Sequence, residues 1–133
     1  MEFITENIIL IAVALGSGAM LLWPVINRAR SGVSLDTLAA TRLINDTGAV
    51  VLDIRTSAEY AGGHLPNARN IPLAELEKRL GELKSNKPVL ICCASGARSG
   101  RALAVLEKAG RTDIYNLDGG LQAWSQAGLP VVK

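Results

Sequence analysis

The sequence predicts an α/β domain with a parallel sheet covered by helices on both faces, preceded by one transmembrane helix. Short apolar runs at residues 49–54, 89–92 and 114–117 have the composition of strands buried on both faces. Segments with apolar residues at helical spacing separate these runs, an alternation typical of parallel α/β sheets. The 133 residues suffice for one domain and an appended segment.

The appended segment is at the amino terminus. Residues 7–27 carry no charge, and Ile8–Ile26 is a run of 19 residues in which Ser17 is the only polar side chain. As a helix, that length spans the hydrocarbon core of a bilayer. A buried helix of a soluble protein would show a polar face. We therefore expect residues 1–30 to be a membrane anchor and residues 31–133 to be the domain.

The charges that flank this segment predict its orientation. Glu2 and Glu6 precede it, whereas Arg28 and Arg30 follow it. The positive-inside rule then places the domain in the cytoplasm, as a single-pass protein of the inner (cytoplasmic) membrane. The alternative is a cleaved signal peptide, but the region before its apolar core would be basic, and here it is acidic.

The first half of the domain begins after a short linker, residues 31–33. Apolar spacing predicts a helix over 35–46, with Ser34 as its N-cap and Gly48 beyond its end. After the strand at 49–54, Thr56 and Glu59 form a capping-box pattern for a short helix that Gly62 and Gly63 end. Asn67 provides a turn residue that tolerates positive φ. An amphipathic helix over 73–80, ended by Gly81, completes this half.

The second half repeats the alternation. The central strand at 89–92 is followed by a helix over 98–109, with Leu103 and Leu106 facing inward, and by a strand at 114–117. Gly119-Gly120 then precedes a last helix over 121–127. Asp118 is the expected cap of that helix, and Trp124 is expected to pack against the sheet.

The loop after the central strand carries the candidate nucleophile. Small residues follow Cys93, so the loop can curl and direct successive backbone N–H groups inward. The N-terminus of the next helix and Arg98 add positive potential. A sulfur held there should ionise readily. The alternative is a small buried hydrophobe, which is the fate expected for Cys92, on the opposite side of the strand.

The number of residues between the cysteine and the arginine of this loop indicates which kind of group the loop can bind. Four residues separate Cys93 from Arg98, one fewer than in the phosphatase signature, so the ring suits a single sulfur atom better than a tetrahedral oxyanion. Here the chain resembles the active loop of the rhodanese (sulfurtransferase) family. Other stretches that resemble the family's segments lie at 51–55, 59–60, 63–72, 116–124 and 128–130. These stretches are distributed over most of residues 34–133, in the order and spacing of the family.

The resemblance implies a function. Cys93 would take a sulfane sulfur from thiosulfate or a persulfide, hold it as a persulfide and pass it to a thiophilic acceptor. The substrate-binding loop would comprise Ala94, Ser95, Gly96, Ala97, Arg98 and Ser99, and no organic cofactor is needed. Thiosulfate-using members often carry a basic residue where this chain has Ala94 and Ser95, so a small or protein-bound persulfide fits at least as well. The anchor suggests a partner at the membrane.

Composition and neighbouring residues exclude some alternatives and leave others open. The formal charge of +2 and the few aromatics give no indication of nucleic-acid binding. Adjacent cysteines rarely form a disulfide, and a single His leaves no ligand set for zinc, so no metal is expected. A rhodanese-type interaction module with little catalysis remains an alternative, and the loop length argues against a phosphatase or an arsenate-reducing enzyme.

Other polar residues of the domain have expected structural roles. Asp53, Arg55 and Glu59 are expected to form a charge network bracing the loop. His64 is expected to be structural, and Arg101 is expected to lie at the surface.

Overall fold

The computed structural model describes residues 1–30, 33–83, 86–95 and 98–133, with the backbone alone for 27–30. These residues form two compact units, Met1–Arg30 and Ser31–Lys133. The predicted linker residues Ser31 and Gly32 and the loop residues Gly96 and Ala97 lie outside the described part.

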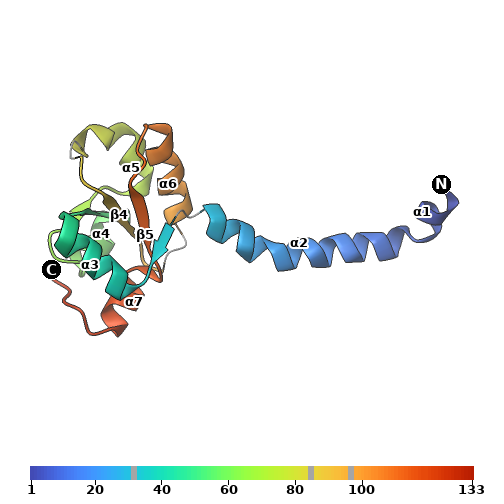
Figure 1. Cartoon of the computed structure of the whole chain (residues 1–133), viewed down its shortest axis with the longest axis horizontal. Coiled ribbons are helices and arrows are strands. Elements are labelled where there is room, and N and C mark those ends of the chain that lie inside the picture. Colours follow the sequence, from blue (N-terminus) through green and yellow to red (C-terminus); the bar gives the residue numbers. More distant parts are fainter. Residues whose placement is uncertain (31–32, 84–85, 96–97) are drawn as a thin grey trace. The chain divides into compact units, whose positions relative to one another are not determined.

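The amino-terminal unit is helical. It consists of α1 (Glu2–Glu6) and α2 (Ile8–Arg30), drawn in blue in Figure 1. Within α2, Ile8–Ile26 has a mean hydropathy of 2.2, and none of it is buried within the structure. This helix is long and apolar enough to cross a membrane. The predicted apolar helix is confirmed. That it spans a membrane, and in which orientation, stay predictions.

The second unit contains a parallel sheet, as predicted, with five strands where the sequence indicated three. Its strand order is β1-β5-β4-β2-β3, so β4 is central. The strands are β1 (Val33–Leu35), β2 (Val50–Asp53), β3 (Arg69–Asn70), β4 (Val89–Cys92) and β5 (Ile114–Leu117). All pairs are parallel, with Asp53 opposite Cys92 at the ends of β2 and β4. The carboxyl ends of the strands therefore share one edge.

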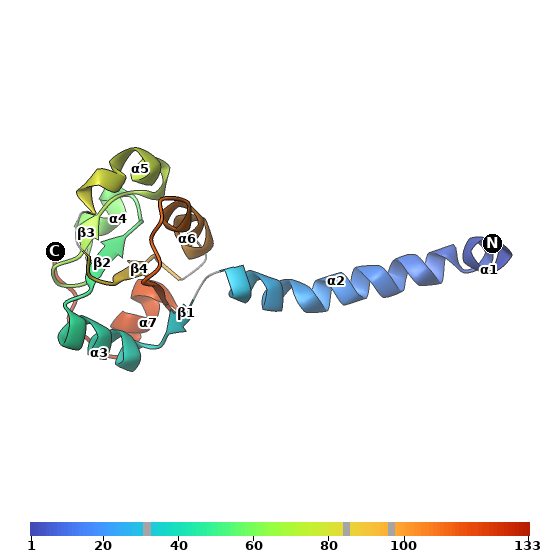
Figure 2. The same cartoon turned by 45° about the horizontal axis from the view of Figure 1, so that its top comes forward.

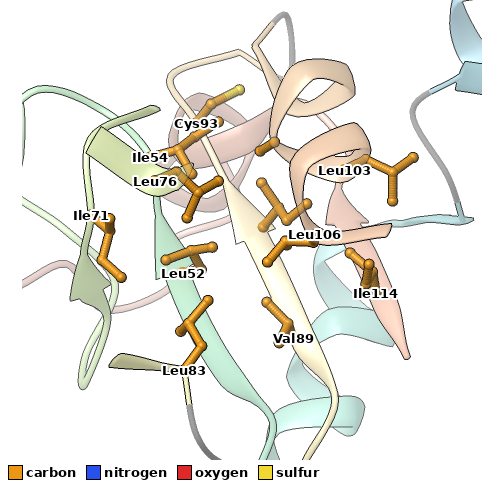
Figure 3. Close-up of a cluster of buried hydrophobic side chains, with 12 residues drawn as sticks. Leu52, Ile54, Ile71, Leu76, Leu83, Val89, Cys93, Leu103, Leu106 and Ile114 are labelled. Carbon is orange, nitrogen blue, oxygen red and sulfur yellow. The ribbon is translucent and has the colours of Figure 1, made fainter. Parts of the chain in front are cut away.

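Helices cover both faces of this sheet, which Figure 2 shows edge-on. They are α3 (Thr37–Thr47), α4 (Ser57–Ala61), α5 (Leu73–Leu76), the 3-10 helix η1 (Glu77–Glu82), α6 (Ser99–Lys108) and α7 (Gly120–Gln126). Side chains alternate along β4, because successive strand residues point to opposite faces. Ile91 lies in the core beneath α5 and α6, and Leu90 in the core that α3 and α7 close. Figure 3 shows the first of these cores.

The start of the domain differs from the prediction. The predicted linker and helix start instead contain β1, in which Val33 pairs with Tyr115 of β5. The cap of α3 is not Ser34 but Asp36, whose side chain accepts a hydrogen bond from the Ala39 N–H at 2.8 Å. The reason is a tertiary contact. Residues 33–35 pair with β5, far along the chain, and this pairing overrides the helical spacing of the local sequence.

Two further predictions were wrong. Residues 73–80 do not form one helix, because α5 ends at Leu76 and continues as η1, with a non-helical Arg79 and with Gly81 inside it. This path brings Leu83 into the same core as Leu76. Asp118 does not cap α7: the N-cap is Gly119, and no side chain caps it.

The remaining elements agree with the sequence. The capping box of Thr56 and Glu59 is present at the start of α4. Asn67 has a φ of 61°, and Gly48 ends α3 in a left-handed conformation. Leu103 and Leu106 are buried, and Trp124 of α7 packs in the core, donating its indole N–H to the Pro130 carbonyl at 2.8 Å.

Candidate active site

Cys93 is the first residue after the central strand, at the carboxyl edge of the sheet. Its side chain is only 1% exposed and belongs to the core beneath α6. The Ile54 N–H donates to the Cys92 carbonyl at 3.1 Å, so Ile54 lies alongside Cys93. Figure 3 shows the Cys93 sulfur projecting beyond this cluster, above Ile54 and Leu76. The candidate nucleophile therefore lies where an open α/β sheet ordinarily binds its ligands.

Cys92 points to the other face, as predicted. It is fully buried in the core that contains Leu90, Leu117 and Trp124. Burial, with a smaller contribution from Asp53, raises the pKa of the Cys92 thiol to about 12. This thiol therefore stays protonated at neutral pH and acts as a small core residue.

Ser99 is the loop residue that the structure brings to the Cys93 sulfur. It is the first residue of α6, is fully buried, and its Oγ lies 3.6 Å from Sγ of Cys93. A hydroxyl at this distance can donate to an anionic sulfur. Ala94 is half-buried and Ser95 exposed, and the part of the predicted N–H nest at Gly96 and Ala97 lies outside the described residues.

The N-terminus of α7 holds the start of the loop. The Leu121 N–H donates to the Cys93 carbonyl at 2.8 Å, and the Gln122 N–H to the Ala94 carbonyl at 3.1 Å. Gly120 has a φ of +56°, and a Cβ there would lie 2.1 Å from the Cys93 carbonyl oxygen. Only glycine permits this approach. The sequence did not lead us to predict this contact, although the two adjacent glycines, Gly119 and Gly120, could have indicated a close approach of the backbone.

The predicted charge network is confirmed. Arg55 and Asp53 form a buried ion pair at 2.8 Å, and Arg55 also donates to the Gly63 carbonyl at 2.6 Å and the Glu59 carbonyl at 3.4 Å. The Glu59 carboxylate in turn binds both terminal nitrogens of Arg98, at 3.2 and 3.1 Å. The network thus joins the end of β2 to the start of α6.

The Glu59–Arg98 pair changes the electrostatics expected of the loop. Hydrogen bonds from Arg98, then from the Thr56 backbone, lower the pKa of Glu59 to about 2. Arg98 stands at the N-cap of α6, where a cation is unfavourable unless an anion compensates it. That anion is Glu59, 39 positions away in the sequence. The charge of Arg98 is therefore already matched within the chain.

His64 has structural contacts, as predicted. Its Nδ1 lies 2.9 Å from the Tyr60 carbonyl oxygen, and its ring stacks on Tyr60 with centroids 3.7 Å apart. Its backbone pairs with Val132 near the carboxyl terminus. Arg101 is exposed, also as predicted. Within the described ranges, no group of three or more His, Cys, Asp or Glu side chains is placed to hold a metal ion.

Comparisons with known proteins agree with this geometry. The model of the rhodanese-like domain matches residues 37–127. The chain is 40% identical over 99 residues to a sulfurtransferase of Allochromatium vinosum, covering 74% of this chain and 92% of that protein. It is 47% identical over 76 residues to the uncharacterised protein YqhL of Bacillus subtilis, covering 57% of this chain and only 60% of YqhL.

Solved structures show the same fold. A rhodanese-related protein of Thermoplasma volcanium is 33% identical, with a TM-score of 0.68 over 75% of this chain and 97% of that one. A rhodanese-like domain protein of Staphylococcus aureus is 32% identical, with a TM-score of 0.65 over 76% of this chain and 99% of that one. By family match and by fold, the chain belongs to the rhodanese-like domain family.

Proposed function

We propose that the domain is a sulfurtransferase in which Cys93 carries the sulfur as a persulfide. The observation that carries the proposal is the placement of the Cys93 sulfur at the carboxyl end of the central strand, 3.6 Å from the buried hydroxyl of Ser99. The family match and the relative named as a sulfurtransferase support the same chemistry.

The reaction has two half-reactions. The Cys93 thiolate attacks the sulfane sulfur of the donor, forming a sulfur–sulfur bond as the donor's own bond breaks. The electron pair of that bond leaves with sulfite, from thiosulfate, or with a thiolate, from an organic persulfide. A thiophilic acceptor then attacks the outer sulfur and restores the Cys93 thiolate. Such a covalent intermediate predicts ping-pong kinetics.

Two groups act on the charge of this intermediate. The Ser99 hydroxyl is placed to donate to the anionic sulfur, and the backbone N–H groups of the loop would act as an oxyanion hole does. The hydrogen bonds from Leu121 and Gln122 to the loop carbonyls hold the backbone in place. A fixed loop needs no reorganisation as the charge moves.

The electrostatics favour a persulfide donor over thiosulfate. Thiosulfate is a dianion, and Arg98, the charged residue of the loop, is already paired with Glu59. The loop itself therefore offers little net positive charge to a dianion. We therefore expect thiosulfate to load Cys93 more slowly than a small organic persulfide does.

The location follows from α2. We propose that this helix anchors the protein in the inner (cytoplasmic) membrane and that the domain faces the cytoplasm, where thiols stay reduced. External protease should then digest the domain in inside-out vesicles and spare it in right-side-out vesicles. The opposite pattern would overturn this orientation.

A rhodanese-type interaction module tethered to the membrane is the second candidate. The low exposure of Cys93 and the pairing of Arg98 favour it, because both restrict access of an anion to the sulfur. In that case the domain would bind a membrane partner without transferring sulfur.

Intact mass spectrometry separates the two functions. The reduced full-length chain in detergent is incubated with thiosulfate and, separately, with glutathione persulfide, beside Cys93→Ala. A gain of one sulfur that cyanide removes, and that the variant lacks, would support the sulfurtransferase. No gain from either donor would overturn it in favour of the interaction module.

A further inference from the structure

A pocket of about 470 Å³ lies between the residues that follow β2, the start of α5 and α6. Its lining combines apolar side chains with two cations: Ile54, Pro72, Leu73, Val105, Arg98 and Arg101. This volume is in the range of small-molecule sites. The mixed lining suits a ligand that has both a carbon chain and a negative charge.

The pocket and the Cys93 sulfur share a wall. Ile54 lines the pocket and also belongs to the core cluster that contains Cys93. The register of β2 and β4 places these two residues side by side at the carboxyl edge of the sheet. Figure 3 shows Ile54 directly beneath the projecting Cys93 sulfur. Ile54 therefore connects the pocket to the residues that surround the Cys93 sulfur.

The two cations of the pocket are not equivalent. Arg98 is matched by the two oxygens of Glu59. Arg101 is exposed, and among the residues that the structure describes it has no salt-bridge partner. Arg101 therefore leaves the pocket with one cation that is not matched within the chain.

From this lining we infer that the pocket binds the organic part of the sulfur donor, and that Arg101 selects a low-molecular-weight persulfide bearing a carboxylate. The inference rests on the proposed function. The apolar side chains contact the carbon chain of the donor, and the Arg101 guanidinium binds the carboxylate. Arg101 is thus a specificity-determining residue at the mouth of the site, a role that its place at the surface did not predict.

The chemistry requires no further reactant. The Cys93 thiolate attacks the outer sulfur of the donor R–S–SH, and the bond between the two donor sulfurs breaks. Its electron pair leaves with the R–S⁻ thiolate, and the transferred sulfur keeps its proton. The carboxylate of R stays on Arg101 throughout, so it affects binding of the donor and leaves the sulfur transfer unchanged.

Two matched donors test this inference: the persulfides of mercaptopropionate, which has a carboxylate, and of mercaptopropanol, which lacks it. The rate constant of Cys93 persulfide formation is measured at limiting donor by quenched-flow mass spectrometry on the full-length chain in detergent. Arg101→Ala should lower the rate constant for the carboxylate donor about five-fold, which is the effect of one partly exposed ion pair. It should lower the rate constant for the alcohol donor by less than about two-fold. Arg101→Lys should retain part of the preference.

Arg42→Ala is the matched control, because it removes an exposed cation from α3, on the other face of the sheet, and should change neither rate. Equal changes for both donors in Arg101→Ala, or none for either, would overturn the inference and leave the proposed function standing. Failure of every donor to load the unmodified chain would overturn the proposed function, and the inference with it.

Discussion

The two adjacent cysteines have almost the same exposure, 0% for Cys92 and 1% for Cys93, yet their surroundings differ on the two sides of the sheet. Cys92 lies among apolar side chains that raise the pKa of its thiol to about 12. Cys93 meets the Ser99 hydroxyl and the loop before α6. The two sulfurs differ because successive residues of a strand point to opposite faces of the sheet, and not because one is more exposed. This alternation places a structural sulfur on one face and the candidate nucleophile on the other.

The same contrast extends to the elements around each sulfur. The face that holds Cys92 is closed by α3 and α7 with side chains such as Leu117 and Trp124. On the other face, the Ser99 hydroxyl meets the Cys93 sulfur, and the Glu59–Arg98 pair lies at the start of α6. Arg55 and the Leu121 N–H favour the charged form of Cys92 as well, but burial outweighs them and keeps the pKa of that thiol raised. The following substitutions are ordered from the largest expected effect to the smallest.

Removal of one sulfur at a time tests the comparison most strongly. Cys93→Ala should abolish persulfide formation, because it removes the candidate nucleophile and the Cys92 thiol is buried and protonated. Cys92→Ala should keep the rate within about three-fold and cost about 1 kcal/mol of stability, as expected for a small core truncation. Both are read by intact mass after loading with glutathione persulfide. Equal losses in the two variants would contradict the assignment of roles.

Gly120 tests whether the Cys93 loop depends on α7. Gly120→Ala should lower the free energy of unfolding by about 3 kcal/mol, because the new Cβ would clash with the Cys93 carbonyl oxygen. The matched control is Gly128→Ala, which has a similar φ of +74° but open space around its Cβ. That variant should lose only about 1 kcal/mol from backbone strain. Denaturant unfolding measures both, and equal losses would show that the contact with α7 has no effect.

Substitution of Ser99 tests whether the hydroxyl beside the Cys93 sulfur contributes to persulfide formation. Ser99→Ala should slow persulfide formation about ten-fold, the loss of one hydrogen bond to a charged sulfur. Ser125→Ala, which is exposed near the end of α7 and outside the loop, should leave the rate unchanged. Single-turnover loading with the persulfide donor provides the rates. A Ser99→Ala rate equal to that of the unmodified chain would remove Ser99 from the site.

The Glu59–Arg98 pair should produce a smaller, pH-dependent effect. The pKa of Glu59 falls from its ordinary value of 4.5 to about 2 in the folded chain. Its stabilisation is therefore complete above pH 4.5 and is lost as the pH falls toward about 2. At neutral pH, Glu59→Gln should be about 1 kcal/mol less stable, since the pair is partly exposed to solvent.

The measurement is chemical denaturation across this pH range. The difference between the unmodified chain and Glu59→Gln should shrink as the solution becomes more acidic. Glu75→Gln is a control, because Glu75 is more exposed and its contact with Arg79 is longer, at 3.9 Å. A difference that stays constant with pH would mean that Glu59 is not paired in solution.

Local sequence signals predicted much of the fold. Continuous apolar runs were enough to place β2, β4 and β5, because strands buried on both faces show little else. The pattern of Thr56 and Glu59 predicted the capping box. The alternation of Cys92 and Cys93 followed from the period of a strand.

The features that sequence reasoning missed depend on distant contacts. The short strand β1 exists only because β5 pairs with it from the other end of the domain. Glu59 and Arg98 meet across 39 positions, so no local pattern indicates that Arg98 is already neutralised. The approach of Gly120 to Cys93 likewise becomes visible only when α7 packs against the end of β4.

The most direct test of the account is to locate the transferred sulfur. The full-length chain is loaded with glutathione persulfide, its sulfurs are trapped by alkylation, and the peptide that contains both cysteines is sequenced by tandem mass spectrometry. The account predicts that the additional sulfur resides on Cys93, while Cys92 remains an unmodified thiol until the chain is denatured. An additional sulfur on Cys92, or a disulfide between the two residues, would contradict it.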